Sequence, residues 1–331
     1  MPDPRTPLPD SRVSPRFAGL VTFARYPRLT DLTHAPSSSP LDWRIYGVPF
    51  DAGVTYRPGA RFAPRAIRDA SQYLKRYHVE HAVDICNTLA MADAGDAPVR
   101  PYSCRENTAA VAAWAAALPG GPPTNPPTRL LALGGDHSIA LANLRATHTR
   151  LGAPKPGLPL IHFDAHLDTV DAVWGEQYSH ASPFIRAIEE GLIDPTRMVS
   201  LGIRGPLNTA ADLDFARDHN ATIITYEDWR YRNGQQTLAA ALAKIADTPA
   251  YLTFDIDALD PAYAPATGTP CPGGFTTAEA LHALRSLRGL NIAGADVVEV
   301  LPDRDPAGTT AFLAAHIAFE ILALDAARRT A

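Results

Sequence analysis

From residue 129 to residue 328 the sequence alternates short apolar segments with longer segments of helical periodicity. The apolar segments predict strands buried on both faces, because a strand with one face in water would alternate apolar and polar residues. Expected strands cover residues 129–133, 158–163, 198–203, 221–225, 251–254 and 292–300, and expected helices cover 138–149, 183–190, 210–219, 234–246, 277–287 and 309–328. Regular alternation predicts right-handed crossovers, and therefore a three-layer α/β/α fold with a central, mainly parallel sheet.

The first part of the chain has a weaker pattern. Residues 1–42 are rich in Pro, Ser and Thr, which predicts an irregular N-terminal arm that is a candidate for packing on a neighbouring subunit. A first strand is expected over residues 43–50, with helices over 64–73 and 102–118, and a proline-rich loop follows at 119–127. We therefore expect one arm (1–42) and a single α/β domain (43–331).

Composition excludes several classes of function. The 331 residues carry a net charge of only -5 with no basic run, which argues against nucleic acid as a partner. The three cysteines are odd in number and widely spaced, which argues against a disulfide framework and for a reducing compartment. There is no secretory signal pattern, and no stretch resembles a membrane-spanning run of about eighteen apolar residues. We expect a cytoplasmic protein that does not enter a membrane.

One apolar segment ends in residues that bind metal ions. The expected strand 158–163 is followed by Asp164, His166 and Asp168, and side chains at i, i+2 and i+4 of an extended chain point the same way. Two carboxylates that converge in a buried place repel each other unless a cation lies between them. The spacing therefore predicts a metal site.

Two further strands end in the same kind of residue. Asp255 and Asp257 follow the expected strand 251–254, and His137 follows 129–133 within the string GGDHS. The carboxyl ends of parallel strands meet at one edge of a sheet, so all of these side chains are expected to lie together. The six candidate ligands are His137, Asp164, His166, Asp168, Asp255 and Asp257.

A simpler interpretation exists for each residue alone. A single histidine at a strand end is usually a hydrogen-bonded core residue, and a single aspartate is often a helix N-cap. Six candidates on three strand ends favour metal binding instead. Four carboxylates and two imidazoles exceed the needs of one tetrahedral zinc ion and suit two divalent ions with bridging carboxylates.

The strings GGDHS, FDAHLD, DIDALDPAYAPATGTPCPGG and VVEVLP, with GVPFDAGVTYRPGARFAPRAIR upstream, resemble the ureohydrolase family of arginases and agmatinases, in particular its agmatinase-like branch. The resemblance extends from about Trp43 to the C-terminus. It implies an arginase-like fold, a homo-oligomer (trimer or hexamer) and two Mn²⁺ ions per chain, with Ni²⁺ in occasional members. The implied reaction hydrolyses a small cationic guanidino compound to urea and an amine.

The resemblance also implies a role for each ligand. One ion would be held by His137, Asp164, Asp168 and Asp255. The other would be held by Asp164, His166, Asp255 and Asp257. Asp164 and Asp255 would then bridge the two ions.

Three further residues and one ligand are expected to serve the reaction. Glu299 ends an apolar strand, and its two oxygens match the fork of a guanidinium group, although a surface carboxylate is the alternative. His180 aligns with the family's proton-shuttling histidine, with a loop-capping histidine as the alternative. Thr269 aligns with a residue lining the substrate pocket. Asp168 is expected to accept a hydrogen bond from the attacking water and orient it.

Departures from the family pattern concern the substrate. Ala181 stands where a glycine usually follows the shuttle histidine, and Thr169 replaces the asparagine typical of arginases. Tyr56 and Ala63 are larger than the residues common at their positions. These differences suggest a narrower pocket, and hence a short guanidino acid or free guanidine rather than agmatine.

Two other classes of protein fit part of the pattern. A deacetylase on the related fold would need one zinc ion and fewer carboxylates, so the pair Asp255 and Asp257, together with Glu299, argues against it. A non-catalytic, metabolite-binding subunit would normally have lost ligands, and none is missing here.

Overall fold

The structure, a computed structural model, describes residues 4–32, 40–118 and 127–330. Residues 119–126 of the expected proline-rich loop lie outside this part. Eight strands form one sheet in the order β4-β1-β5-β10-β9-β6-β7-β8, and every pairing between neighbours is parallel. These strands are β1 (Trp43–Gly47), β4 (Met91–Asp96), β5 (Arg129–Leu133), β6 (Leu158–Phe163), β7 (Ile193–Ile203), β8 (Thr222–Thr225), β9 (Ala250–Asp255) and β10 (Ile292–Val298). A separate antiparallel pair is formed by β2 (Tyr77–His78) and β3 (Val83–Asp84).

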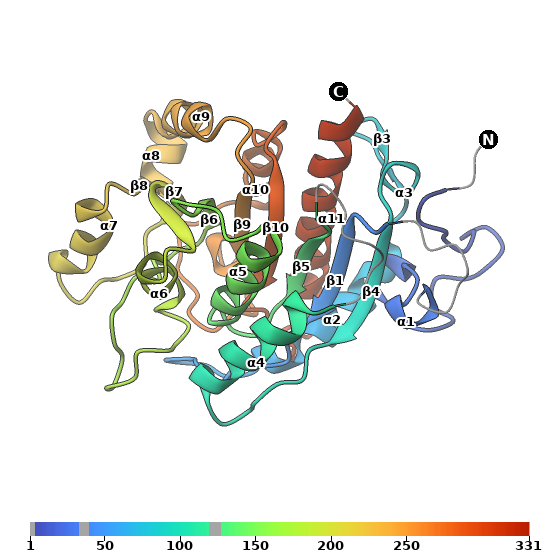
Figure 1. Cartoon of the computed structure of the whole chain (residues 1–331), viewed down its shortest axis with the longest axis horizontal. Coiled ribbons are helices and arrows are strands. Elements are labelled where there is room, and N and C mark those ends of the chain that lie inside the picture. Colours follow the sequence, from blue (N-terminus) through green and yellow to red (C-terminus); the bar gives the residue numbers. More distant parts are fainter. Residues whose placement is uncertain (1–3, 33–39, 119–126, 331) are drawn as a thin grey trace.

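Helices cover both faces of the large sheet (Figure 1). The α-helices are α1 (Leu29–Leu32), α2 (Ala63–Ala70), α3 (Ile85–Thr88), α4 (Cys104–Ala116), α5 (Ile139–Arg150), α6 (Pro183–Glu189), α7 (Asp214–Asp218), α8 (Tyr226–Tyr231), α9 (Gly234–Ile245), α10 (Thr277–Arg285) and α11 (Thr309–Thr330). Short 3-10 helices are η1 (Phe23–Arg25), η2 (Ala60–Phe62), η3 (Ser71–Tyr73), η4 (Ala210–Leu213), η5 (Ile256–Ala258) and η6 (Pro302–Arg304).

The central strands β1, β5, β6, β9 and β10 are buried on both sides, as their composition predicts. Successive residues of β5 enter different cores, with Leu130 in the cluster that includes residues of α4 and α5, and Leu131 in the cluster with α2, α10 and α11. Side chains of a strand alternate between faces, so each strand contributes to both layers of helices. The predicted three-layer fold with a parallel sheet is confirmed.

Several boundaries differ from the expected ones. The edge strand β4 was not expected, because its sequence MADAGD is poor in β-branched and aromatic residues. Strand β7 begins at Ile193, five residues before the expected start, and β10 ends at Val298. The single helix expected over 210–219 is divided into η4 and α7.

The described part of the arm packs on its own chain. Phe23 and Tyr26 are buried in the same core cluster as residues of α2 and α11, and the Phe23 amide donates to Asp93 Oδ2 at 2.7 Å. The arm is also not wholly irregular, since it contains η1 and α1. These contacts attach residues 4–32 to the edge of the sheet near β4.

One described helix, α11, is long and apolar enough to cross a membrane, contrary to the expectation that no stretch approaches this character. Of its most apolar window, 83% is buried inside the protein. It contacts α2, α10 and β10. Its apolar character is explained by its place in the core, where most sides of the helix touch other elements.

The α11 residue Glu320 provides a test of fold stability. Its carboxylate is buried and contacts His78 Nε2 at 3.0 Å, His81 Nε2 at 2.7 Å and Arg285 Nε at 3.1 Å. Burial alone would raise the pKa of Glu320, but hydrogen bonds from His78 and Arg285 outweigh it and lower the pKa from 4.5 to about 2. The ionised form is therefore favoured in the folded protein.

We expect Glu320→Gln to lower the free energy of unfolding by about 3 kcal/mol at pH 7. A carboxylate with a depressed folded pKa contributes its full stability above the unfolded pKa near 4.5, and loses it as the pH falls through about 2. The difference in the free energy of unfolding between wild type and variant, measured by urea unfolding, should therefore become smaller as the pH falls from 5 to 2. Glu227→Gln, at an exposed position, is the matched control. An equal loss of stability in both variants would contradict a stabilising role for the buried Glu320 carboxylate.

Candidate metal centre

The candidate ligands follow strands that are neighbours in the middle of the sheet. The order β5-β10-β9-β6 brings together residues from distant parts of the sequence. His137 follows β5, Glu299 follows β10, Asp255 ends β9, and Asp164 follows β6. The expected meeting of strand ends at one edge is therefore realised.

The ligands after β6 do not converge on an extended chain, as the sequence pattern predicts they would. That strand ends at Phe163, so Asp164, His166 and Asp168 lie in a loop and not on an extended chain. Asp168 has a φ of 53°, in the left-handed region that non-glycine residues rarely adopt. A turn in the loop, rather than the two-residue period of a strand, places Asp168 beside the other ligands. Asp257 likewise lies in η5, beyond the end of β9.

The first group of ligands surrounds one ring nitrogen. His137 Nδ1 lies 2.8 Å from Asp168 Oδ2, 3.0 Å from Asp164 Oδ2 and 3.3 Å from Asp255 Oδ2. Neighbouring ligands in an octahedral shell with bond lengths of about 2.1 Å are separated by about 3.0 Å. The donor atoms thus have the spacing of ligands to one ion.

The hydrogen bonds behind His137 allow a neutral ring whose Nδ1 carries no proton. The Thr253 hydroxyl donates to Asp296 Oδ1. The Thr253 oxygen can therefore accept a hydrogen bond from the Nε2–H of His137, and Nε2 and Oγ1 are 2.8 Å apart. Nδ1 is buried and has no hydrogen-bond partner among the described residues. A lone pair that faces three carboxylate oxygens is repulsive unless a cation lies among them, so these residues fit a divalent ion.

The second group shares Asp164 with the first. His166 Nδ1 lies 3.4 Å from Asp164 Oδ1 and 3.2 Å from Asp257 Oδ2. Asp164 therefore presents Oδ2 to one histidine and Oδ1 to the other. A carboxylate that points one oxygen into each of two groups is the arrangement of a bridging ligand. For Asp255, Oδ2 faces His137, whereas Oδ1 accepts the Asp257 amide at 2.7 Å.

The concentration of negative charge shows in the ionisation of these groups. Burial and the neighbouring carboxylates raise the pKa of both Asp255 and Asp257. Burial opposes ionisation of Asp164 too, but the neighbouring rings of His137 and His162 lower its pKa. Burial likewise disfavours the charged form of His137, yet Asp164, Asp168 and Asp255 raise its pKa well above the usual value. The site requires positive charge, which either protons or metal ions supply.

His162 was missed in the sequence and belongs to this site. It is fully buried, its Nε2 lies 2.9 Å from Asp164 Oδ2, and its Nδ1 lies 3.1 Å from Ser200 Oγ. It comes two residues before Asp164, so the alternation of the strand would have placed both on the same side. Its contact orients the carboxylate shared by the two groups.

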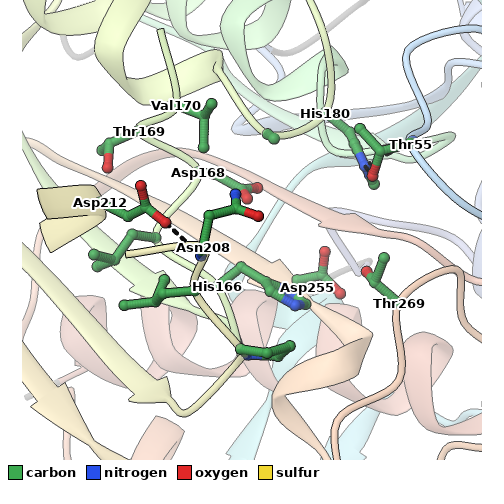
Figure 2. Close-up of a pocket in the computed structure, with 14 residues that line it drawn as sticks. Thr55, His166, Asp168, Thr169, Val170, His180, Asn208, Asp212, Asp255 and Thr269 are labelled. Carbon is green, nitrogen blue, oxygen red and sulfur yellow. Dashed lines mark hydrogen bonds between the residues drawn. The ribbon is translucent and has the colours of Figure 1, made fainter. Parts of the chain in front are cut away.

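A pocket opens beside the ligands (Figure 2). Its wall includes the predicted residues His166, Asp168, His180, Asp255 and Thr269. The Thr269 hydroxyl donates to Asp257 Oδ2 at 3.2 Å.

Only two of the four substitutions thought to narrow the pocket lie on its wall. Thr169 and Ala181 line it. Tyr56 is 65% exposed, and Ala63 is buried in the core cluster around α2 and α11, so neither can narrow the pocket as expected. The suggestion of an unusually narrow pocket therefore loses half its support.

His180 is held between two partners at the pocket wall. Its Nδ1 lies 2.9 Å from Glu299 Oε1, and its Nε2 lies 2.7 Å from Thr55 Oγ1. Burial disfavours a charged ring, but the Glu299 carboxylate outweighs it and raises the pKa of His180 to about 9. The Thr55 hydroxyl can donate to the neutral ring or accept from the charged one, while the Thr55 amide, 3.0 Å from Nε2, favours the neutral ring. His180 thus has the partners that a proton donor and acceptor requires.

Glu299 lies behind His180 rather than on the pocket wall. Its Oε1 accepts from the His137 amide at 2.8 Å as well as facing His180. Only Oε2 is without a partner among the described residues, and it is buried close to Gly268, where a Cβ would lie 3.2 Å away. The expected pairing of both oxygens with a guanidinium fork does not fit this arrangement, since one oxygen is already engaged.

We expect Thr253→Val to weaken metal binding by about 10- to 100-fold, because His137 would lose the acceptor that fixes its tautomer. Metal content after dialysis against graded chelator concentrations measures the change. Thr147→Val is a matched control, since the Thr147 hydroxyl is buried without a partner among the described residues. Equal metal retention in the two variants would show that Thr253 does not act through His137.

The chain is similar in sequence and in fold to known proteins. The profile of the arginase family matches residues 41–324. A guanidinopropionase from Pseudomonas aeruginosa is 40% identical over 322 residues, covering 95% of this chain and 94% of that protein. An agmatinase from Photorhabdus laumondii is 39% identical over 325 residues, covering 97% of this chain and 96% of that protein. The solved structure of proclavaminate amidino hydrolase from Streptomyces clavuligerus superposes with a TM-score of 0.84 at 36% identity, covering 95% of this chain and 100% of that one. The chain belongs to the arginase family.

Proposed function

We propose that this protein hydrolyses the guanidinium C–N bond of a small guanidino compound to give urea and an amine, with two Mn²⁺ ions per chain. Ni²⁺ is the alternative metal. The chain is a metal-dependent amidinohydrolase, as its family and its relatives named for guanidino substrates indicate. The same relatives argue against a deacetylase and against a subunit without catalytic activity.

The proposal of two ions rests mainly on Asp164, whose two oxygens face different groups of ligands. Asp164 directs Oδ2 towards His137 and Oδ1 towards His166, and each histidine faces further carboxylates. One ion would be held by His137, Asp164, Asp168 and Asp255, and the other by Asp164, His166, Asp255 and Asp257. When bound, such ions lower the pKa of water towards neutrality and so supply the nucleophile that a resonance-stabilised guanidinium carbon requires.

Residues of the pocket wall would position the substrate and move protons. Asp168 faces both the His137 group and the pocket, so it can accept a hydrogen bond from the attacking water. The Thr269 oxygen can accept a hydrogen bond from a guanidinium N–H while the Thr269 hydroxyl donates to Asp257 Oδ2. His180 would give a proton to the departing amine nitrogen, which must gain one as the C–N bond breaks. Glu299 favours the charged state of His180, and its free Oε2 is the remaining candidate acceptor for the substrate.

Urea release tests this function. The manganese-loaded and nickel-loaded protein would be assayed with agmatine, guanidino acids, free guanidine and an acetyl-lysine peptide. We expect urea from at least one guanidino compound and no acetate from the peptide. Release of acetate, or the absence of urea from every guanidino compound in fully loaded protein, would overturn the proposal.

We propose a cytoplasmic homo-oligomer, trimer or hexamer, without nucleic-acid or membrane partners. The low net charge of -5 supports the absence of a nucleic-acid partner.

A further inference from the structure

The charged residues of the pocket fall into two groups. Asp168, Asp255 and His166 belong to the proposed metal ligands, and His180 lies beside them. Away from these, Asp212 of η4 is the one charged side chain that the described residues contribute to the wall. No lysine or arginine lines the pocket within the part of the chain that the structure describes.

The negative charge of Asp212 is not compensated by its described partners. Oδ2 accepts from the backbone amides of Asn208 at 2.7 Å and Thr209 at 3.1 Å, and Oδ1 lies 3.5 Å from the Thr209 hydroxyl. All three are neutral groups. The side chain is partly exposed to solvent, so a ligand in the pocket can reach it.

Asp212 lies across the pocket from the groups that would hold the guanidinium. In Figure 2 it is to the left of Asp168, while Thr269 and His180 are to the right. A substrate with its guanidinium group near Thr269 would extend its other end towards Asp212. A positively charged end would be attracted there, whereas a carboxylate would meet a like charge with no cation beside it.

Similarity to known proteins does not decide between these ends. Relatives of nearly equal identity are named guanidinopropionase and agmatinase. Two of the residues that suggested a short guanidino acid, Tyr56 and Ala63, do not line the pocket. The charge on the wall is therefore the more direct indication.

We propose that Asp212 selects a substrate whose tail ends in a cation, an aminoalkyl guanidine such as agmatine, over a guanidino acid of equal length. This inference rests on the proposed function and goes beyond it by naming the substrate class. It assigns Asp212 a role in specificity, remote from the bond that breaks.

Three substrates of one chain length test the proposal, namely agmatine, 4-guanidinobutanoate and butylguanidine, which end in a cation, an anion and a methyl group. The manganese-loaded protein should have the highest kcat/KM for agmatine and the lowest for 4-guanidinobutanoate. In Asp212→Asn the ratio of kcat/KM for agmatine to that for butylguanidine should fall about 3- to 10-fold, the scale of one partly screened ion pair. An amide oxygen can still accept from Asn208 and Thr209, so the local fold should persist.

Two further variants sharpen the test. Asp214→Asn removes the same charge two residues away, where the side chain is 59% exposed, and should keep the wild-type ratio. Asn208→Lys places a cation on the same part of the wall and should raise kcat/KM for 4-guanidinobutanoate relative to butylguanidine. Calorimetry with 1,4-diaminobutane and 4-aminobutanoate, the products of agmatine and 4-guanidinobutanoate, measures binding without turnover. The wild-type protein should bind the diamine more tightly than it binds 4-aminobutanoate.

The outcomes separate this inference from the proposed function. Urea from 4-guanidinobutanoate in preference to agmatine, or equal ratios in Asp212→Asn and Asp214→Asn, would overturn the role of Asp212 while leaving the hydrolase intact. No urea from any of the three substrates, with metal fully bound, would instead count against the proposed function. Loss of the diamine preference only in Asp212→Asn would support the role.

Discussion

Asp255→Asn is expected to lower the rate of urea release by on the order of 10³-fold or more and to reduce metal content below two ions per chain. Asp255 ends β9 in the middle of the sheet, and its Oδ2 lies 3.3 Å from His137 Nδ1. The amide removes one negative charge from the proposed pair of cations and turns either an oxygen or an N–H donor towards them. Activity and metal content measured on the same preparation check the result.

The exposed Asp303→Asn is the control for Asp255→Asn, because it makes the same change in charge in η6, at the protein surface. Circular dichroism and a thermal unfolding midpoint would show that both variants are folded. A folded Asp255→Asn protein with two bound ions and wild-type activity would contradict the assignment of Asp255 as a ligand.

His180→Ala is expected to lower kcat by about 10²- to 10⁴-fold while leaving two metal ions bound, the usual range for loss of a proton donor. His180 is linked to Glu299 and Thr55 and makes no described contact with the proposed ligand atoms. Its loss should therefore affect proton transfer to the departing amine rather than metal binding. Steady-state kinetics and metal analysis of the same sample measure the two effects separately.

His282→Ala, an exposed histidine on α10, should behave like wild type in both measurements. Loss of metal in His180→Ala would show that this histidine supports the metal centre instead of proton transfer. Unchanged kcat with full metal content would show that it is a loop-capping residue without a part in the reaction.

The sequence predicts most of the sheet because its strands are buried on both faces and hence continuously apolar. The segments 129–133 and 158–163 match β5 and β6 at both ends. The edge strand β4 has no such signature, since it is stabilised by pairing with β1 and by contacts with the arm rather than by the character of its own residues. The order of the strands in the sheet cannot be predicted from the sequence pattern either, because it depends on how the crossover helices pack.

For the candidate site, residue identity is more predictable than geometry. The six predicted ligands lie in two groups around His137 and His166. The turn that gives Asp168 its positive φ and the engagement of Glu299 Oε1 by two donors depend on tertiary contacts, which no local pattern encodes. Sequence alone does not single out Asp212, because it is the acidic residue of the capping box of η4, and only the structure places it on the pocket wall as well.

Anomalous diffraction from a crystal of the manganese-loaded protein tests the central claim most directly. The account predicts two manganese peaks per chain, one among His137, Asp164, Asp168 and Asp255, and one among Asp164, His166, Asp255 and Asp257. A single fully occupied peak, or manganese bound away from these residues, would contradict it.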